Sequence, residues 1–161
     1  DRTVPAFVQE SEIDGVYNFS RISQGPGFGG ATDPAAMSAL KAQGFTTVIS
    51  LRTEGENGFD PEAARIAAEA AGLEYIHLPF NTREPATDIV QNFIDAVDDP
   101  DNQPPYIHCG SATRVAALWM IKRIEDDGMP RQAAQAEAEA IAGKPEAAVA
   151  WATGYLEEKQ D

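Results

Sequence analysis

Two hydrophobic patterns follow one another along the chain: short apolar runs, and longer stretches with apolar residues on one helical face. "TTVISLR" (46–52), "EYIHLPF" (74–80) and "PPYIHC" (104–109) are apolar runs of strand length. Runs this short, rich in β-branched and aromatic residues, predict buried strands. A less regular run, "VYNFSRIS" (16–23), predicts a further strand near the start of the chain.

Segments with helical periodicity separate these runs. "DPAAMSALKAQG" (33–44) and "DPEAARIAAEAAG" (60–72) both begin with Asp-Pro and end with Gly, the residues that favour helix starts and ends. The segment 87–99 carries one apolar helical face, formed by Ile89, Val90, Phe93, Ile94 and Val97. Three more helices are predicted over 113–128, 130–143 and 145–159.

Strands that alternate with helices predict an α/β fold with a mainly parallel sheet of four to five strands, flanked by helices on both faces. With 161 residues, no internal repeat and no linker, we expect a single domain over 1–161. The glycines between the first strand and the first helix lack the context of a dinucleotide-binding turn. We expect them to form a surface turn: Gly25, Gly27, Gly29 and Gly30.

Charge and composition narrow the possible functions. A net charge of −14 and a sequence pI of about 4.4 argue against nucleic acid and anionic membranes as partners. One cysteine and two histidines argue against an internal disulfide and a metal site, and no motif calls for a cofactor. The acidic composition and a start at Asp1 favour a periplasmic or secreted protein over a cytoplasmic one.

The single cysteine, Cys109, stands where the strand 104–109 ends and a helix begins, in "YIHCGSATRVAALWM". The residues between Cys109 and Arg114 are all small, so their backbone N–H groups can converge on one anion. A helix N-terminus and a nearby guanidinium also stabilise a thiolate. These features favour a nucleophile held in an anion-binding loop, with Arg114 gripping two oxygens of the anion. The alternative is a buried, unreactive cysteine, the commoner state of a free thiol. The loop residues are Gly110, Ser111, Ala112, Thr113 and Arg114.

This loop, together with "GFTTVISLR", "AGLEYIHLPF" and "IVQNFIDAV" ahead of it, resembles the tyrosine and dual-specificity phosphatase superfamily. The opening "NFSRISQGPGFGGATDPAAMSALKAQGF" resembles a bacterial subgroup, the beta-lactamase-hydrolase-like phosphatases. The resemblance implies a phosphoric monoester hydrolase in which Cys109 carries a phosphoryl group and Arg114 stabilises the transition state. It implies that His108 tunes the thiolate, and that the partner is a phosphorylated small molecule or a phosphoprotein.

Three positions depart from the superfamily pattern. Four residues rather than five separate Cys109 from Arg114, a spacing that the bacterial subgroup shares. Val115 stands where the superfamily usually has Ser or Thr, whose hydroxyl helps the thiolate leave. Ser111 or Thr113 would have to supply that hydroxyl. Asn81 stands where the general acid Asp is often found.

Two nearby carboxyls are therefore candidates for the general acid. We favour Glu84, which lies within the loop "NTREPAT"; Asp88 is expected to cap or start the next helix.

Two other functions fit the same residues. Rhodanese sulfurtransferases also use a four-residue gap and carry a persulfide on the cysteine. A pseudophosphatase that binds phosphate without turnover would explain Asn81 and Val115. Elsewhere, Arg52 is expected to pair with Glu54 or Glu56, Arg83 to steer a substrate or be solvated, and three residues to be structural: His77, Trp119 and Trp151.

Overall fold

The computed structural model describes residues 2–3, 6, 8–86 and 88–160. The predicted domain ends at Asp1 and Asp161, which lie outside the described residues. Thr87, the predicted start of a helix, also lies outside them. The strands are β1 (Val8–Glu10), β2 (Ser20–Ile22), β3 (Gly27–Gly29), β4 (Thr47–Ser50), β5 (Glu74–His77) and β6 (Pro105–His108). The α-helices are α1 (Met37–Ala42), α2 (Pro61–Ala70), α3 (Ile89–Asp98), α4 (Thr113–Glu125), α5 (Arg131–Ile141) and α6 (Pro145–Gln160).

The strands form one six-stranded sheet in the order β1-β2-β3-β6-β4-β5. β3, β6, β4 and β5 run parallel, whereas β1 and β2 add an antiparallel edge. The predicted α/β class is therefore confirmed, and the sheet is mixed, with more strands than expected. The predicted strand 16–23 shortens to β2: Ser20–Ile22 pair with β1, and Ser20 and Arg21 also pair with β3.

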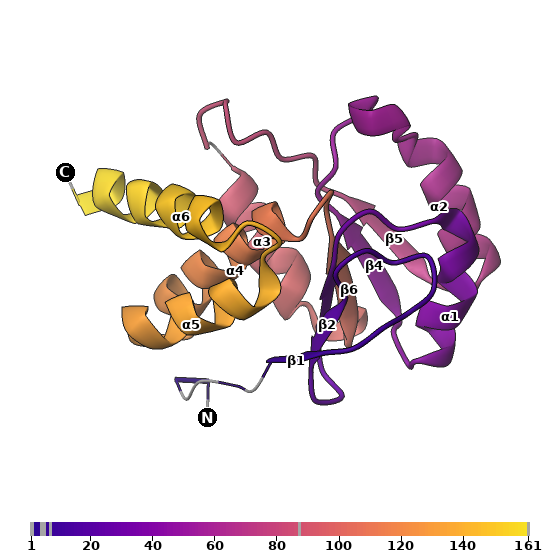
Figure 1. Cartoon of the computed structure of the whole chain (residues 1–161), viewed down its shortest axis with the longest axis horizontal. Helices are drawn as coiled ribbons and strands as arrows, with labels where there is room; N and C mark the ends of the chain where they lie inside the picture. Colours follow the sequence, from indigo (N-terminus) through magenta and orange to yellow (C-terminus); the bar gives the residue numbers. More distant parts are fainter. Residues whose placement is uncertain (1, 4–5, 7, 87, 161) are drawn as a thin grey trace.

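Helices cover both faces of the sheet, with α1 and α2 on one side and α3 to α6 on the other (Figure 1). Successive residues of a strand point to opposite faces, so each central strand supplies both layers. Val48 of β4 packs with the α1–α2 layer, and its neighbour Ile49 packs with the layer of α3 to α6. The same division holds for Tyr106 and Ile107 of β6.

The helix signals of the sequence act as expected. The Asp60 side chain accepts hydrogen bonds from the N–H groups of Glu62 and Ala63, and Gly72 adopts a positive φ of 86° after α2. Asp33 likewise caps the turn before α1. Four of the five apolar positions of α3 are buried: Val90, Phe93, Ile94 and Val97.

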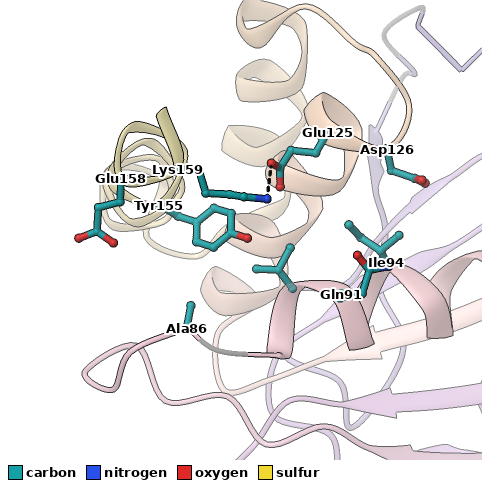
Figure 2. Close-up of a pocket in the computed structure, with 9 residues that line it drawn as sticks. Ala86, Gln91, Ile94, Glu125, Asp126, Tyr155, Glu158 and Lys159 are labelled. Atoms are coloured by element: carbon teal, nitrogen blue, oxygen red, sulfur yellow. Dashed lines mark hydrogen bonds and ion pairs between the residues drawn. The ribbon is translucent and has the colours of Figure 1, made fainter. Parts of the chain in front are cut away.

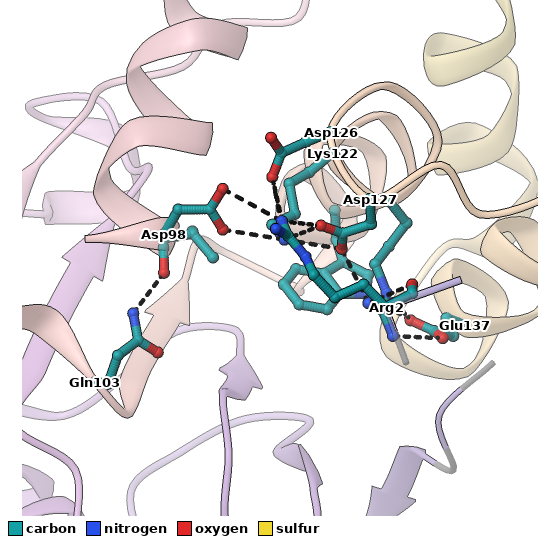
Figure 3. Close-up of polar contacts among 10 residues, drawn as sticks. Arg2, Asp98, Gln103, Lys122, Asp126, Asp127 and Glu137 are labelled. Carbon is teal, nitrogen blue, oxygen red and sulfur yellow. Dashed lines mark hydrogen bonds and ion pairs between the residues drawn. The ribbon is translucent and has the colours of Figure 1, made fainter. Parts of the chain in front are cut away.

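The far end of α4 is tied to its surroundings by buried ion pairs (Figure 3). Asp127 accepts hydrogen bonds from Lys122 at 2.8 Å and from Arg123 at 2.9 Å. Arg123 also donates to Glu137 of α5 at 2.9 Å, and Glu137 accepts a further hydrogen bond from the Trp119 indole at 2.8 Å. Because each of these buried charges has a partner, the network fixes α4 against α5 without leaving an unpaired charge in the core.

The prediction of a surface turn at the glycines is wrong for 27–30. Gly27 and Gly29 belong to β3, a buried strand beside β6, and Gly30 follows it. A Cβ at Gly27 would meet the Phe45 ring, one at Gly29 would meet the Tyr106 hydroxyl, and one at Gly30 would lie 2.6 Å from the Gly110 oxygen. These glycines are required because neighbouring groups approach the backbone too closely for any side chain.

We predict that Gly30→Ala destabilises the protein by about 1–3 kcal/mol and displaces the loop after β6, because the added methyl group overlaps the Gly110 carbonyl. Gly154→Ala is the matched control, since a Cβ at this position in α6 meets no atom within 4 Å. The control should gain about 0.5–1 kcal/mol. Urea denaturation measures both, and equal stability of the two variants would contradict the packing argument.

Candidate active site

Three loops meet beyond the carboxyl ends of adjacent parallel strands, where α/β sheets place their sites. The loop after β4 carries Glu56, the loop after β5 carries Asn81 and Arg83, and the loop after β6 carries Cys109. Arg114 lies in the first turn of α4, directly after the third loop. The sequence prediction that the strand before Cys109 leads through a short loop into a helix is thus confirmed.

The carbonyl groups of the Cys109 loop are held by the surrounding scaffold. The Gly110 oxygen accepts a hydrogen bond from the Ala31 N–H at 2.8 Å, and the Ser111 oxygen accepts one from the Gly143 N–H at 2.9 Å. In a trans peptide the N–H points away from the C=O of the same plane. The N–H groups of Ser111 and Ala112 therefore point to the opposite side of the loop.

The backbone of the loop has the shape of an anion nest. Ala112 adopts a left-handed conformation with φ 66° and ψ 5°, which is uncommon for a residue other than glycine. A left-handed residue beside helical ones turns successive N–H groups toward one point. Within the part of the chain that the structure describes, no N–H of 110–113 has a hydrogen-bond partner. The loop can therefore accept an anion.

Arg114 is fixed by a two-point ion pair with Glu56. Its two terminal nitrogens, Nη1 and Nη2, each lie 2.7 Å from one of the Glu56 carboxylate oxygens. Burial lowers the pKa of Arg114, but Glu56 and the neighbouring Cys109 outweigh this and raise it. Arg114 therefore stays charged beside Cys109, with its orientation set by the carboxylate.

Glu56 is a site residue whose sequence context indicates only a pairing with Arg52. It does pair with Arg52, whose Nε lies 3.2 Å from Oε2, and it also accepts a hydrogen bond from the Thr53 N–H at 2.7 Å. Burial alone would raise the pKa of Glu56, but the hydrogen bonds from Arg114 and Thr53 lower it to about 2. Its position after a parallel strand neighbouring β6 is the signal that could have identified it.

His108 is buried directly before the cysteine. Its ring stacks on Tyr106 with a centroid distance of 5.5 Å, and Nδ1 lies 3.2 Å from the Gly30 oxygen. Burial lowers the pKa of His108 to about 4, so the imidazole is neutral at neutral pH and can donate its Nδ1 proton to Gly30. His108 thus joins the cysteine loop to the segment that follows β3.

A cleft of about 290 Å³ opens beside Arg114. It is lined by Thr53, Glu56, Phe80, Asn81, Thr82, Arg83 and Arg114. Glu84, the predicted general acid, is exposed and lines an adjacent cavity with Trp151 and Tyr155 instead. The Glu84 carboxylate lies 3.5 Å from the Asn81 side-chain nitrogen. Of the predicted catalytic residues, Arg114 lines this cleft, Cys109 and His108 are buried, and Glu84 lies outside the cleft.

The remaining candidates have structural contacts. Asp88 occupies the N-cap position of α3 without a side-chain capping bond, and Val115 is fully buried in the core. The hydroxyls of Ser111 and Thr113 lie 2.9 Å apart. His77 contacts the Arg52 carbonyl through Nε2 at 2.6 Å. Trp151 packs edge-on against Phe80 and donates a hydrogen bond to the Thr82 carbonyl at 3.2 Å.

A larger groove of about 680 Å³ lies between α3, α6 and the end of α4 (Figure 2). Lys159 crosses it to pair with Glu125 at 3.2 Å, and none of the Cys109 loop residues lines it. Among the described residues, no group of three or more His, Cys, Asp or Glu side chains is arranged to hold a metal ion. None of the described helices combines the length and the apolar character needed to span a bilayer.

We predict that Glu56→Gln lowers stability by about 1–2 kcal/mol at pH 7, because the charged hydrogen bonds with Arg114 and Arg52 are lost. A carboxyl with a folded-state pKa of about 2 and an ordinary value of 4.5 stabilises the fold above pH 4.5. That contribution declines as the pH falls from 4.5 toward 2. The difference between variant and wild type should therefore shrink at low pH.

Denaturation midpoints at pH 7 and pH 3 test this prediction. Glu139→Gln, on the exposed side of α5, serves as the control and should change stability little at either pH. A stability difference for Glu56→Gln that does not depend on pH would contradict the ionised pairing.

The fold is shared with solved structures of phosphatases. The chain is similar to a cysteine-to-serine variant of TpbA from P. aeruginosa in complex with phosphotyrosine, with a TM-score of 0.72 and 18% identity over 93% of this chain and 90% of that chain. It is also similar to the core catalytic domain of the PP-IP phosphatase SIW14 from S. cerevisiae, with a TM-score of 0.66 and 16% identity, over 83% and 81% of the two chains.

The family follows from the sequence match. A model of the phosphatase-like domain of beta-lactamase hydrolase-like proteins matches residues 26–126, and the chain belongs to this family. A beta-lactamase hydrolase-like protein from Agrobacterium fabrum (strain C58 / ATCC 33970) is 27% identical over 99 residues, covering 60% of this chain. Those residues span 23% of that relative's length, so the chain corresponds to less than a quarter of it.

Proposed function

We propose that this chain is a cysteine-dependent phosphatase that hydrolyses phosphate monoesters, phosphotyrosine or small aryl phosphates, through a cysteinyl-phosphate intermediate. The observation that carries the proposal is the orientation of the loop 109–114. The carbonyl groups of Gly110 and Ser111 are bonded to the scaffold, and the N–H groups of 110–113 have no hydrogen-bond partner among the described residues. Arg114 closes the same loop. A dianionic phosphoryl group is the ligand that such a nest and a guanidinium bind best.

The reaction proceeds in two displacements. The Cys109 thiolate attacks phosphorus, the bond to the ester oxygen breaks, and the leaving group departs with that electron pair. Water then attacks the cysteinyl phosphate, releasing inorganic phosphate and restoring the thiolate. The N–H groups of the loop and the guanidinium of Arg114 stabilise the charge on the equatorial oxygens in both steps. Neutral His108 supports the loop by its contact with Gly30.

The leaving oxygen needs a proton, and the cleft's own carboxyl cannot supply it. Glu56 has a pKa of about 2 and is therefore ionised at neutral pH. Glu84 lies on the same loop as Asn81, three residues further along, and is exposed. We assign the general acid to Glu84, which reaches the leaving group once the loop turns it toward the cleft.

We predict that Cys109→Ser lowers the rate of p-nitrophenyl phosphate hydrolysis by at least about a thousandfold, because the nucleophile is lost. The affinity for inorganic phosphate should be retained within about threefold, because N–H groups and Arg114 provide the binding. Phosphate release and calorimetric titration measure the two quantities. A wild-type protein that turns thiosulfate and cyanide into thiocyanate, but releases no phosphate from aryl phosphates, would support sulfur transfer instead.

A second prediction concerns the leaving group. Glu84→Gln should lower kcat about 10- to 100-fold on phenyl phosphate, whose leaving group must be protonated. The same variant should change kcat little on p-nitrophenyl phosphate, whose leaving group departs as an anion. Glu158→Gln, at an exposed position of α6 in the same cavity, is the control. Equal effects of Glu84→Gln on both substrates would remove Glu84 from the reaction.

A further inference from the structure

We propose that Arg83 determines substrate specificity by binding a second anionic group, next to the phosphoryl group in the loop 109–114. This inference rests on the proposed phosphate site. It goes beyond that site by naming the substrate class: phosphate monoesters that carry a further carboxylate or phosphate close to the ester.

Arg83 differs from most basic residues of the chain because its side chain has no ionic partner among the described residues. Arg52, Arg114, Lys122 and Arg123 are all held in ion pairs with carboxylates. In the described part of the chain, by contrast, the guanidinium of Arg83 has no ion pair, and only its backbone N–H is bonded, to Asn81. In a protein with a net charge of −14, a guanidinium without a carboxylate partner in the same cleft as Arg114 is available to an anionic ligand.

The position of Arg83 allows it to act on the substrate of the loop. Arg83 and Arg114 line the same cleft of about 290 Å³. Glu56 is the only carboxylate among the described residues that line this cleft, and both of its oxygens are engaged by Arg114. No carboxylate of the cleft is therefore left to neutralise Arg83.

Arg83 also lines the neighbouring cavity, whose other lining residues include Trp151, Tyr155 and the carboxylates of Glu84 and Glu158. A substrate bound through its phosphate at Arg114 would thus pass Arg83 as it leaves the cleft. A guanidinium at this place favours an anion over a neutral group of equal size, since it can donate two parallel hydrogen bonds. The strongly negative remainder of the protein restricts this attraction to groups inside the cleft.

The test compares two ligands of nearly equal shape, p-carboxyphenyl phosphate and p-carbamoylphenyl phosphate. Their dissociation constants are measured with the Cys109→Ser protein, so that turnover does not interfere. We expect this protein to prefer the carboxylate ligand by roughly threefold to fivefold, as for an exposed ion pair. Adding Arg83→Gln should abolish the preference. Adding Arg131→Gln, an exposed arginine on α5 that lines a separate hollow, should preserve it.

Two results would overturn the inference: no preference in the Cys109→Ser protein, or a preference that survives Arg83→Gln. If the Cys109→Ser protein bound neither ligand, the phosphate site itself would be overturned. A preference without any turnover by the wild type would support Arg83 as an anion-binding residue and remove the phosphatase.

Phosphotyrosine peptides with Glu or Gln beside the phosphotyrosine identify the source of the second anion. If the protein discriminates between these peptides and the discrimination depends on Arg83, the second anion belongs to a protein substrate. If only the aryl phosphates are discriminated, the second anion belongs to a small-molecule substrate.

Discussion

The hydrogen bonds that hold the carbonyl groups of the cysteine loop are the constraint on which the site depends. Ala31 and Gly143 each donate a backbone N–H to a loop carbonyl, at 2.8 and 2.9 Å. Without these bonds the peptides of 110–112 could rotate, and carbonyl oxygens would repel the anion that the N–H groups attract. The donors come from the segment after β3 and from the turn before α6, so the cradle is assembled only when the whole fold is formed.

The second constraint is the charge balance around Arg114. Glu56 holds both terminal nitrogens of the guanidinium and is itself kept ionised by them. This pairing restricts the rotamers of a long side chain before any substrate arrives, which lowers the entropic cost of binding. It also removes Glu56 as a proton donor. The same carboxylate thus explains both why Arg114 is positioned and why the acid must come from another loop.

The helix ends and the cysteine loop could be predicted from the sequence, because the residues that specify them are close together in the chain. Asp60, Pro61 and Gly72 mark the ends of α2 by their own conformational preferences, and the Cys109 loop is recognisable from the strand before it and the small residues within it. β3 escaped prediction because a strand of Gly27, Phe28 and Gly29 has no alternating side-chain pattern. Its burial is imposed by Phe45 and Tyr106, which are distant in sequence. The role of Glu56 depends likewise on a contact across 58 residues.

The central claim is that Cys109 acts as the nucleophile. The group bound to its sulfur during turnover tests this claim most directly. Acid quenching of the protein during hydrolysis of an aryl phosphate, followed by mass spectrometry of the peptide around Cys109, shows what the sulfur holds. We expect one phosphoryl group on Cys109. Phosphate release with an unmodified Cys109 under conditions that preserve thiophosphates, or a persulfide in its place, would contradict it.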